Sequence, residues 1–458
     1  MSVIIDKDAD RNNNNRKMNT IQQAPSPPPQ FVLRGGENDV SAIAFLKFPY
    51  LVSGTVSGIM KIWSFTNRRI VNENTPHNSL AILKLEFVRF YKNDIIFLSQ
   101  GRDGLIKLWK LLIIENYNNN IVNLEELRVI QSGSFAYCKI SLFQHRHKNE
   151  IILASPSRED DEFIIYKMSN TMQNEKQKNH TKIDKKMSTK DFKHLDGIQS
   201  ISELNNRKKG MIMCIKIINA FIVLLGYESG EICVYNIENK ICTAIEAGHT
   251  ESILSMDFAE YIMSSKKKKK KKKKKKEEKQ QQDEETDKTH NNNPEDNPRQ
   301  ELHNKIHDEY RGFSGGADNS LVVYQLNVHG ICELNIKKVL KVPCKGIADI
   351  KIRRHHYDEA KQYLYKIVVC AGWDGKVRIY GFKKVRLLAV LNYHEGSVYD
   401  VCFPWYVPID NQYDQEETAL SVPKINDFEH GIFASSGKDG RIACWNVYGS
   451  PVLKTVMT

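Results

Sequence analysis

The sequence predicts an all-β protein of the β-propeller class, and three observations lead to this fold. A hairpin pattern recurs along the 458 residues, in which a pair of small residues, a tight turn and an alternating apolar strand end in Trp or Tyr. A separate apolar strand precedes several of these hairpins, and another follows the aromatic residue. Once long polar segments are set aside, each unit holds about 40–45 residues, the length of a four-stranded blade.

The hairpin is clear at six places. The matches are LVSGTVSGIMKIW (51–63), FLSQGRDGLIKLW (97–109), VLLGYESGEICVY (223–235), GFSGGADNSLVVY (312–324), VVCAGWDGKVRIY (368–380) and FASSGKDGRIACW (433–445). A seventh, ILASPSREDDEFIIY (152–166), is degraded but stands where a unit is missing. Gly and Asp supply the turn geometry, and the period-two apolar pattern supplies buried faces. Seven such units are typical of a seven-bladed propeller of the WD40 type.

The flanking strands complete each unit, whose strands we name a to d from the inside outward. Strand a is expected at VSAIAF (40–45), SILSMDF (252–258), IADIKI (347–352) and SVYDVCF (397–403). Strand d is expected at KICTAIE (240–246) and RLLAVLN (386–392). The hairpins themselves are strands b and c.

The ends of the chain predict how the ring closes. The last unit ends near Val447 with three strands, and the segment 31–33 (Phe-Val-Leu) precedes the first full strand without a partner nearby. We expect this segment to form strand d of blade seven, which removes the open edges of the row of blades. The propeller is then expected over residues 30–450, preceded by a disordered tail, residues 1–29, that is Asn-rich and then Pro-rich.

Recurring polar residues indicate a structural network in the blades. Asp103, Asp318, Asp374 and Asp439 take the same turn position in four units, while His249 and His394 precede strand a. We expect Asp, His, a strand Ser and an aromatic residue such as Trp445 to form a hydrogen-bonded chain that locks a blade. The alternative is a hydrolase that uses His394, Ser435 or Ser436, and Asp439. Recurrence at four turns favours the structural role, because a catalytic Asp would normally be unique.

Other chemistry is sparse in the sequence. There is no phosphate-binding loop and no GxSxG nucleophile elbow. The nine cysteines form no CxxC pair, which is typical of buried thiols in a reducing compartment. No signal peptide or membrane-spanning run is visible. We therefore expect no enzyme activity, no cofactor, no metal and no membrane association, and a nuclear or cytoplasmic location.

The net charge of +12 comes from one tract. Residues 266–276 are eleven consecutive lysines, and without them the net charge is 12 − 11 = +1. A nucleic-acid-binding body needs cations spread over a folded face. The tract still leaves an alternative function open, that of a chromatin or nucleic-acid binder acting through Lys266–Lys276.

The insertions divide the predicted ring into two unequal faces. Segments at about 112–125, 169–199, 260–310, 353–363 and 404–431 lie between strands a and b or follow strand c, and so fall on one side, here called the insertion face. The other side, here called the turn face, carries the b–c turns and the d–a loops. We expect the turn face to meet a protein partner, through Arg102, Trp373 and Lys438, the residues that precede three of the turn aspartates.

A narrower resemblance is carried by six phrases, which are similar to the family of guanine nucleotide-binding protein β-subunit-like protein 1 and its fungal counterpart, ASTRA-associated protein 1. They are PPPQFVLRG (27–35), SQGRDGLIKLW (99–109), LLGYESGEICVYNIENKIC (224–242), KGIADIKI (345–352), AGWDGKVRIY (371–380) and LAVLNYHEGSVYDVCF (388–403). The resemblance extends from about Pro27 to Val447, outside the insertions.

The resemblance implies a non-enzymatic adaptor. It implies an ASTRA-type component linked to chromatin remodelling and to the chaperone-assisted maturation of phosphatidylinositol 3-kinase-related kinases. The implied partners are Tel2–Tti1–Tti2-type proteins and RuvB-like ATPases. A G-protein γ subunit is not expected, because residues 1–30 lack the heptads of an N-terminal coiled coil.

Overall fold

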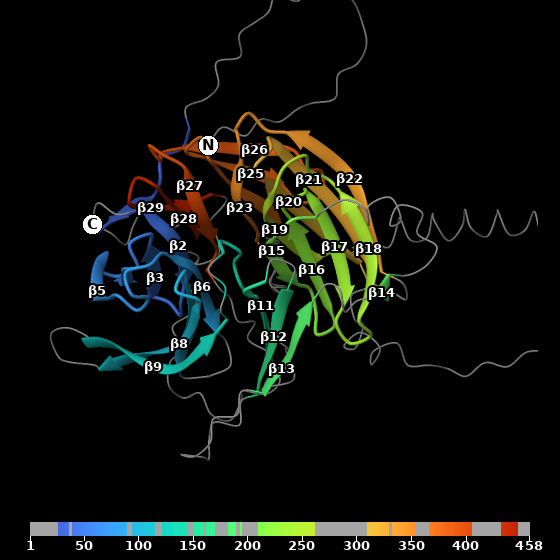
Figure 1. Cartoon of the computed structure of the whole chain (residues 1–458). Coiled ribbons are helices and arrows are strands. Elements are labelled where there is room, and N and C mark those ends of the chain that lie inside the picture. Colours follow the sequence, from blue (N-terminus) through green and yellow to red (C-terminus); the bar gives the residue numbers. More distant parts are fainter. Residues whose placement is uncertain are drawn as a thin grey trace, which may run out of the picture.

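Seven sheets, each with four antiparallel strands, form a ring of blades in the computed structural model (Figure 1). Every regular element of the described residues is a β-strand, so the predicted all-β, seven-bladed fold is confirmed. The structure describes residues 26–35, 39–88, 94–114, 121–132, 134, 136–144, 150–159, 162–169, 182–188, 193–194, 209–261, 309–328, 332–353, 366–404 and 432–447. Within these ranges, no segment forms a helix that could cross a membrane.

Each blade runs from an inner strand a to an outer strand d. Blade 1 comprises β2 (Val40–Phe45), β3 (Tyr50–Thr55), β4 (Met60–Ser64) and β5 (Arg69–Asn74); blade 2 comprises β6 (Ile82–Val88), β7 (Ile95–Gly101), β8 (Leu105–Ile114) and β9 (Ile121–Gln131). Blade 3 comprises β10 (Ser141–Gln144), β11 (Glu150–Pro156), β12 (Glu162–Ser169) and β13 (Lys182–Ser188); blade 4 comprises β15 (Ile212–Ile217), β16 (Ile222–Tyr227), β17 (Glu231–Asn236) and β18 (Ile241–Ala247).

The remaining blades follow the same order. Blade 5 comprises β19 (Ile253–Glu260), β20 (Glu309–Gly316), β21 (Ser320–Asn327) and β22 (Glu333–Lys341); blade 6 comprises β23 (Ile347–Ile352), β24 (Ile367–Gly372), β25 (Lys376–Gly381) and β26 (Leu387–Asn392). Blade 7 comprises β27 (Val398–Cys402), β28 (Ile432–Gly437), β29 (Arg441–Asn446) and, on its outside, β1 (Phe31–Arg34). A short fifth strand, β14 (Lys193–His194), runs parallel to β18 on the outer edge of blade 4.

The ring is closed by the first strand of the chain. β1 pairs antiparallel with β29, in a register that places Phe31 opposite Cys444 and Leu33 opposite Ile442. Leu33 is 1% exposed and belongs to a core cluster that joins blade 7 to blade 1. The predicted closure by residues 31–33 is confirmed.

The core lies between the blades. Each blade turns one apolar face toward the next, so that seven separate clusters fill the spaces around the ring. Between blades 6 and 7, for example, Val369 and Ile379 pack with Phe433 and Trp445. Burial of alternating residues on both faces of each sheet explains why strands b and c read as nearly continuous apolar runs.

Two of the expected insertions contain regular sheet. In the segment 112–125, β8 and β9 remain paired as far as Ile114 opposite Ile121, where both strands still carry apolar residues. In the segment 169–199, β13 supplies strand d of blade 3. The insertion expected over 112–125 thus includes paired residues of strands c and d of blade 2, and the one expected over 169–199 includes strand d of blade 3. The tail 1–25, most of the segments 260–310, 353–363 and 404–431, and the tract Lys266–Lys276 lie outside the described residues.

Candidate functional site: the turn face of the ring

The turn face is organised by one repeated backbone hydrogen bond. In six blades, the residue at the apex of the b–c turn donates its N–H to a carbonyl oxygen of the adjoining d–a loop. The bonds join Val56 to Asp39 (3.0 Å), Arg102 to Ala81 (2.9 Å), Glu228 to Met211 (3.0 Å), Ala317 to Ser252 (2.9 Å), Trp373 to Gly346 (3.0 Å) and Lys438 to Ser397 (2.9 Å). Because each turn is tied to its neighbouring loop, the apex side chains are held at equivalent positions around the ring. They form a preorganised surface, which lowers the entropy cost of binding.

Trp373 presents one side of its ring and packs the other. Its side chain is 40% exposed. The packed side rests on Gly346, where a Cβ atom would lie 2.6 Å from the indole, so only glycine leaves room for the ring. Ser397 adds a hydrogen bond from its hydroxyl to the carbonyl of Trp373, at 3.1 Å. The indole is thus a supported platform with an exposed edge and face.

Arg102 and Lys438, the other two predicted contact residues, differ in their surroundings. Arg102 is half-buried, and its guanidinium donates to the hydroxyl of Tyr137 at 2.7 Å while lying 4.3 Å from the centre of that ring. Tyr137 is 64% exposed, so the two side chains form one projecting pair. Lys438 is exposed, and the start of its side chain lies against Gly396.

Three further exposed residues join these into an arc. Val56 is 48% exposed at the apex of blade 1, and Leu80 is 46% exposed in the loop between blades 1 and 2. The arc consists of Trp373, Lys438, Val56, Leu80, Arg102 and Tyr137, and extends from blade 6 through the closure of the ring to the loop before blade 3. Aligning the seven hairpins would have found Val56, since it precedes Ser57 as Arg102 precedes Asp103. Leu80 and Tyr137 lie in loops without a repeating pattern.

Beneath the turn face, blade 7 carries a complete polar lock. His394 contacts Asp439 through Nδ1 at 3.0 Å and Ser435 through Nε2 at 2.8 Å, and the indole of Trp445 donates to Ser435 at 2.9 Å. Ser435 is 0% exposed. A serine buried in this way, with its oxygen taken by an indole N–H, lacks the access that a nucleophile needs. The geometry fits a structural chain.

Blades 2 and 5 carry the same lock with different members. In blade 5, His249 contacts Asp318 at 2.8 Å and Ser314 at 2.7 Å, and the hydroxyl of Tyr324 lies 3.1 Å from Ser314. In blade 2, the carboxylate of Asp103 lies 3.0 Å from Nδ1 of His77. The hydroxyl oxygen of Ser99 lies 2.8 Å from Nε2 of His77 and accepts the indole N–H of Trp109, also at 2.8 Å. The sequence reasoning missed His77 because it follows a proline rather than the glycine that precedes His249.

Asp374 of blade 6 has a different partner from the expected histidine. The loop before its blade, residues 342–346, contains no histidine. The guanidinium of Arg378 takes the place of the imidazole, with nitrogen–oxygen distances of 2.6 and 3.0 Å to the carboxylate. Burial alone would raise the pKa of Asp374, but Arg378 outweighs burial and lowers it. This carboxylate stays charged, and the turn is held by an ion pair.

The locks predict how stability depends on pH. Burial lowers the pKa of His77 and of His249, against the raising effect of Asp103 and Asp318. A lowered folded-state pKa gives stability that is present above the unfolded value, about 6.5, and is lost as pH falls below it. We expect the free energy of unfolding to fall between about pH 7 and pH 5, by at most ~1.4 kcal/mol per pH unit for each histidine. Urea unfolding across this range measures the slope.

The variant His249→Gln gives the control for this slope. It should be less stable at neutral pH, because the lock of blade 5 is broken, and its stability should depend less on pH than that of the wild type. Asp400, whose pKa is raised by burial, acts in the opposite direction and is unchanged in this comparison. Equal slopes for the wild type and His249→Gln would contradict the assignment.

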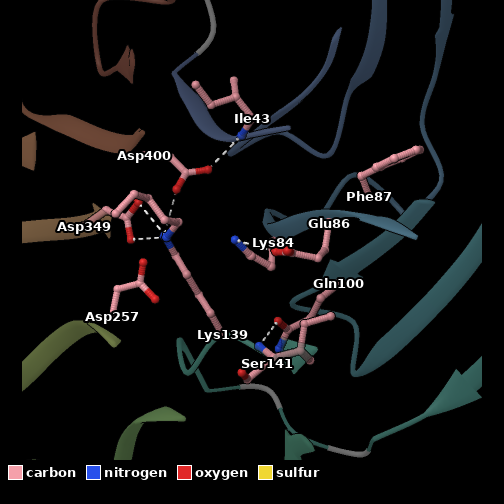
Figure 2. A network of polar contacts seen from close by, with 12 residues as sticks. Ile43, Lys84, Glu86, Phe87, Gln100, Lys139, Ser141, Asp257, Asp349 and Asp400 are labelled. Carbon is pink, nitrogen blue, oxygen red and sulfur yellow. Dashed lines mark hydrogen bonds and ion pairs between the residues drawn. The ribbon is translucent and has the colours of Figure 1, made fainter. Parts of the chain in front are cut away.

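Around the axis of the ring, the inner strands hold a second polar network (Figure 2). Four ion pairs lie here: Lys84–Glu86 (3.0 Å), Lys139–Asp400 (3.6 Å), Lys216–Asp257 (2.6 Å) and Lys351–Asp349 (2.8 Å). Burial would lower the pKa of Lys84, but Glu86 and Asp400 outweigh it and raise that pKa. Burial would likewise raise the pKa of Asp349, but Lys351 and Lys139 lower it. Lys84 and Asp349 are therefore charged although they are buried.

The same acids connect neighbouring blades. Asp257 accepts the N–H of Ile352 at 2.8 Å, Asp349 that of Val401 at 3.2 Å, and Asp400 that of Ile43 at 2.8 Å. Each bond runs from the inner strand of one blade to the inner strand of the next. These three hydrogen bonds link blades 5, 6, 7 and 1 in succession, and so they cross the place where the ring closes. Among the described residues, no cluster of His, Cys, Asp and Glu is arranged to hold a metal ion.

Comparison with known proteins places this ring among named relatives. The mouse guanine nucleotide-binding protein subunit beta-like protein 1 is 25% identical over 439 residues, which cover 93% of this chain and 98% of the mouse protein. The chain is a homologue of that protein. ASTRA-associated protein 1 of Schizosaccharomyces pombe is 23% identical, covering 92% of this chain and 99% of its own length, and that of Yarrowia lipolytica is 22% identical, covering 92% and 95%. No protein-family profile matches.

These alignments extend over nearly the whole length of each relative, so the similarity covers the whole ring of this chain rather than one blade of it. The resemblance seen in the sequence is confirmed. Together, the WD40-type ring and these homologues support a scaffold role.

Proposed function

We propose that the protein is a non-enzymatic scaffold that docks a protein partner on its turn face. The observation that carries this proposal is the arc of side chains on tied apexes and neighbouring loops of the turn face, from Trp373 to Tyr137. Trp, Tyr and Arg that are accessible on a rigid support are the residues that dominate the energy of protein interfaces. The polar locks beneath the face serve to hold it in shape.

We further propose that the scaffold belongs to an ASTRA-type assembly. Relatives named ASTRA-associated protein 1 align with the chain over almost their full length, which supports an ASTRA-type role. In this proposal the scaffold acts in chromatin remodelling and in the chaperone-assisted maturation of phosphatidylinositol 3-kinase-related kinases, in the nucleus or the cytoplasm. Its partners would be Tel2–Tti1–Tti2-type proteins and RuvB-like ATPases.

The docking face is tested by Trp373→Ala and Arg102→Glu in the full-length protein. Both side chains project from turns, so we expect thermal stability to change by no more than about 1 kcal/mol. Loss of an anchor at the centre of an interface costs about 2 kcal/mol or more, which corresponds to about thirtyfold weaker binding. Affinity purification from native cells, read by quantitative mass spectrometry, measures partner recovery.

Leu387→Ala is the matched control. Leu387 is 51% exposed on β26, at the outer edge of blade 6 and away from the turn face. Its truncation should leave partner recovery at the wild-type level. Undiminished recovery with both Trp373→Ala and Arg102→Glu would show that the partner docks elsewhere.

A further inference from the structure

Three lysines surround the Trp373 platform. Lys345 precedes Gly346, on which the indole rests; Lys376 begins β25, three residues after Trp373; and Lys438 is tied to Ser397, which is hydrogen-bonded to Trp373. Lys345 and Lys438 are exposed and Lys376 is half-buried. Within the described part of the chain, none of the three ammonium groups has a carboxylate partner.

The carboxylates at the same place are already engaged. Asp374 is paired with Arg378 at 2.6 Å, Asp439 contacts His394 at 3.0 Å, and Glu395 is paired with Arg441 at 2.7 Å. Each of these acids therefore has an arginine or histidine partner rather than one of the three lysines. Together with Arg378 and Arg441, the three lysines outnumber these three carboxylates, so positive charge is in excess around Trp373, and a positive patch favours a negative partner.

The exposed part of the Trp373 indole favours an apolar group on the partner. An indole with one side packed on Gly346 and 40% of its surface exposed keeps a fixed orientation, because the backbone bonds of Trp373 and Ser397 hold the turn. Burying the rest of the ring requires an apolar or aromatic side chain from the partner. Flanking carboxylates would then meet the lysines at the rim, where charges set specificity and association rate.

We propose that the segment docked at blades 6 and 7 is an acidic peptide with an apolar anchor, which packs on Trp373 while its carboxylates contact Lys345, Lys376 and Lys438. This inference rests on the proposed docking function of the turn face and names the chemistry of its partner. The strongest contact with the partner is then at Trp373 on blade 6, next to blade 7, where β1 closes the ring.

The test uses the purified full-length protein and three fluorescein-labelled peptides of one length. The first carries Glu and Asp around a central Leu-Phe pair, the second replaces its acids with Gln and Asn, and the third replaces them with Lys. Fluorescence anisotropy measures binding at low and high salt. We expect the acidic peptide to bind at least about tenfold more tightly than either counterpart, and its advantage to shrink at high salt because exposed charges are screened.

Variants locate the binding on the surface. Trp373→Ala should weaken the acidic peptide by about tenfold or more, and Lys438→Glu combined with Lys345→Glu by a similar factor. Lys47→Glu is the matched control, since Lys47 is an exposed lysine in the a–b turn of blade 1, on the insertion face. Similar affinity for the acidic and neutral peptides, preference for the lysine peptide, or no binding of any peptide would overturn the proposal.

Partner recovery from cells separates this inference from the proposed function. If Trp373→Ala abolishes recovery while the Lys345→Glu and Lys438→Glu double variant retains it, the face docks a partner but the acidic chemistry is wrong. If both variants lose recovery and the acidic peptide binds as expected, both proposals stand. Full recovery with Trp373→Ala and with Arg102→Glu would remove the docking function itself.

Discussion

Replacing Leu33 with Asp is expected to abolish the closed ring. Leu33 is 1% exposed in β1 and packs in the cluster shared by blades 7 and 1. The substitution removes the apolar contact and places a carboxylate among apolar side chains, a combination that costs on the order of 4 kcal/mol or more. Because a folded domain is stable by only about 5–15 kcal/mol, most of its stability is lost. Urea unfolding and size-exclusion chromatography measure the change.

Arg34→Ala is the control for this experiment. Arg34 lies on the same strand but is exposed, so its truncation should leave stability within about 0.5 kcal/mol of the wild type. Loss of β1 pairing also leaves β29 as an unpaired edge, and we expect the Leu33→Asp protein to aggregate. A monomeric Leu33→Asp protein with the stability of the wild type would contradict closure by β1.

The second large effect is expected for Asp349→Ala. The carboxylate of Asp349 accepts from the ammonium of Lys351 at 2.8 Å, the hydroxyl of Ser255 at 3.0 Å and the backbone N–H of Val401 at 3.2 Å. Alanine leaves all three donors without this acceptor in a site where Asp349 is 1% exposed. Removing one member of a buried ion pair costs about 3–5 kcal/mol. Chemical denaturation of the purified protein measures the loss.

A double variant shows whether the unpaired charge causes this loss. Asp349→Ala with Lys351→Met removes both charges, and we expect it to recover part of the stability. Glu395→Ala is the control, because Glu395 forms an ion pair with Arg441 at the surface, where such pairs are worth at most about 1 kcal/mol. A stability loss for Asp349→Ala no larger than that for Glu395→Ala would refute the role assigned to the axial network.

Most of the fold was accessible from the sequence because its signals are local and repeated. The alternation around each Gly-Asp turn marks strands b and c, and the unpaired segment 31–33 has only one sheet that lacks a strand. His77 was missed because no glycine lies near it, whereas Gly248 precedes His249 and Gly396 lies two residues after His394. The Arg378 partner of Asp374 was missed because an ion pair within one hairpin substitutes for a bond from the loop.

The axial network was not accessible, because its contacts depend on ring closure. Lys139, in the segment just before blade 3, forms an ion pair with Asp400 in blade 7, and no sequence spacing relates these residues. Similarly, Leu80 and Tyr137 join the arc only because successive loops come together on one face. The hairpin of β8 and β9 has the sequence pattern of an insertion, because Asn-rich residues interrupt its apolar residues between Ile114 and Ile121.

The pairing of β1 with β29 has a consequence for synthesis of the chain. Phe31 is synthesised 413 residues (444 − 31) before its partner Cys444. At about 5–20 residues per second, roughly 20–80 s separate the two events. Throughout this interval the nascent blades form an open row with two unpaired edges, so the ring can close only once Cys444 has left the ribosome, and until then neighbouring nascent chains compete for the same strand.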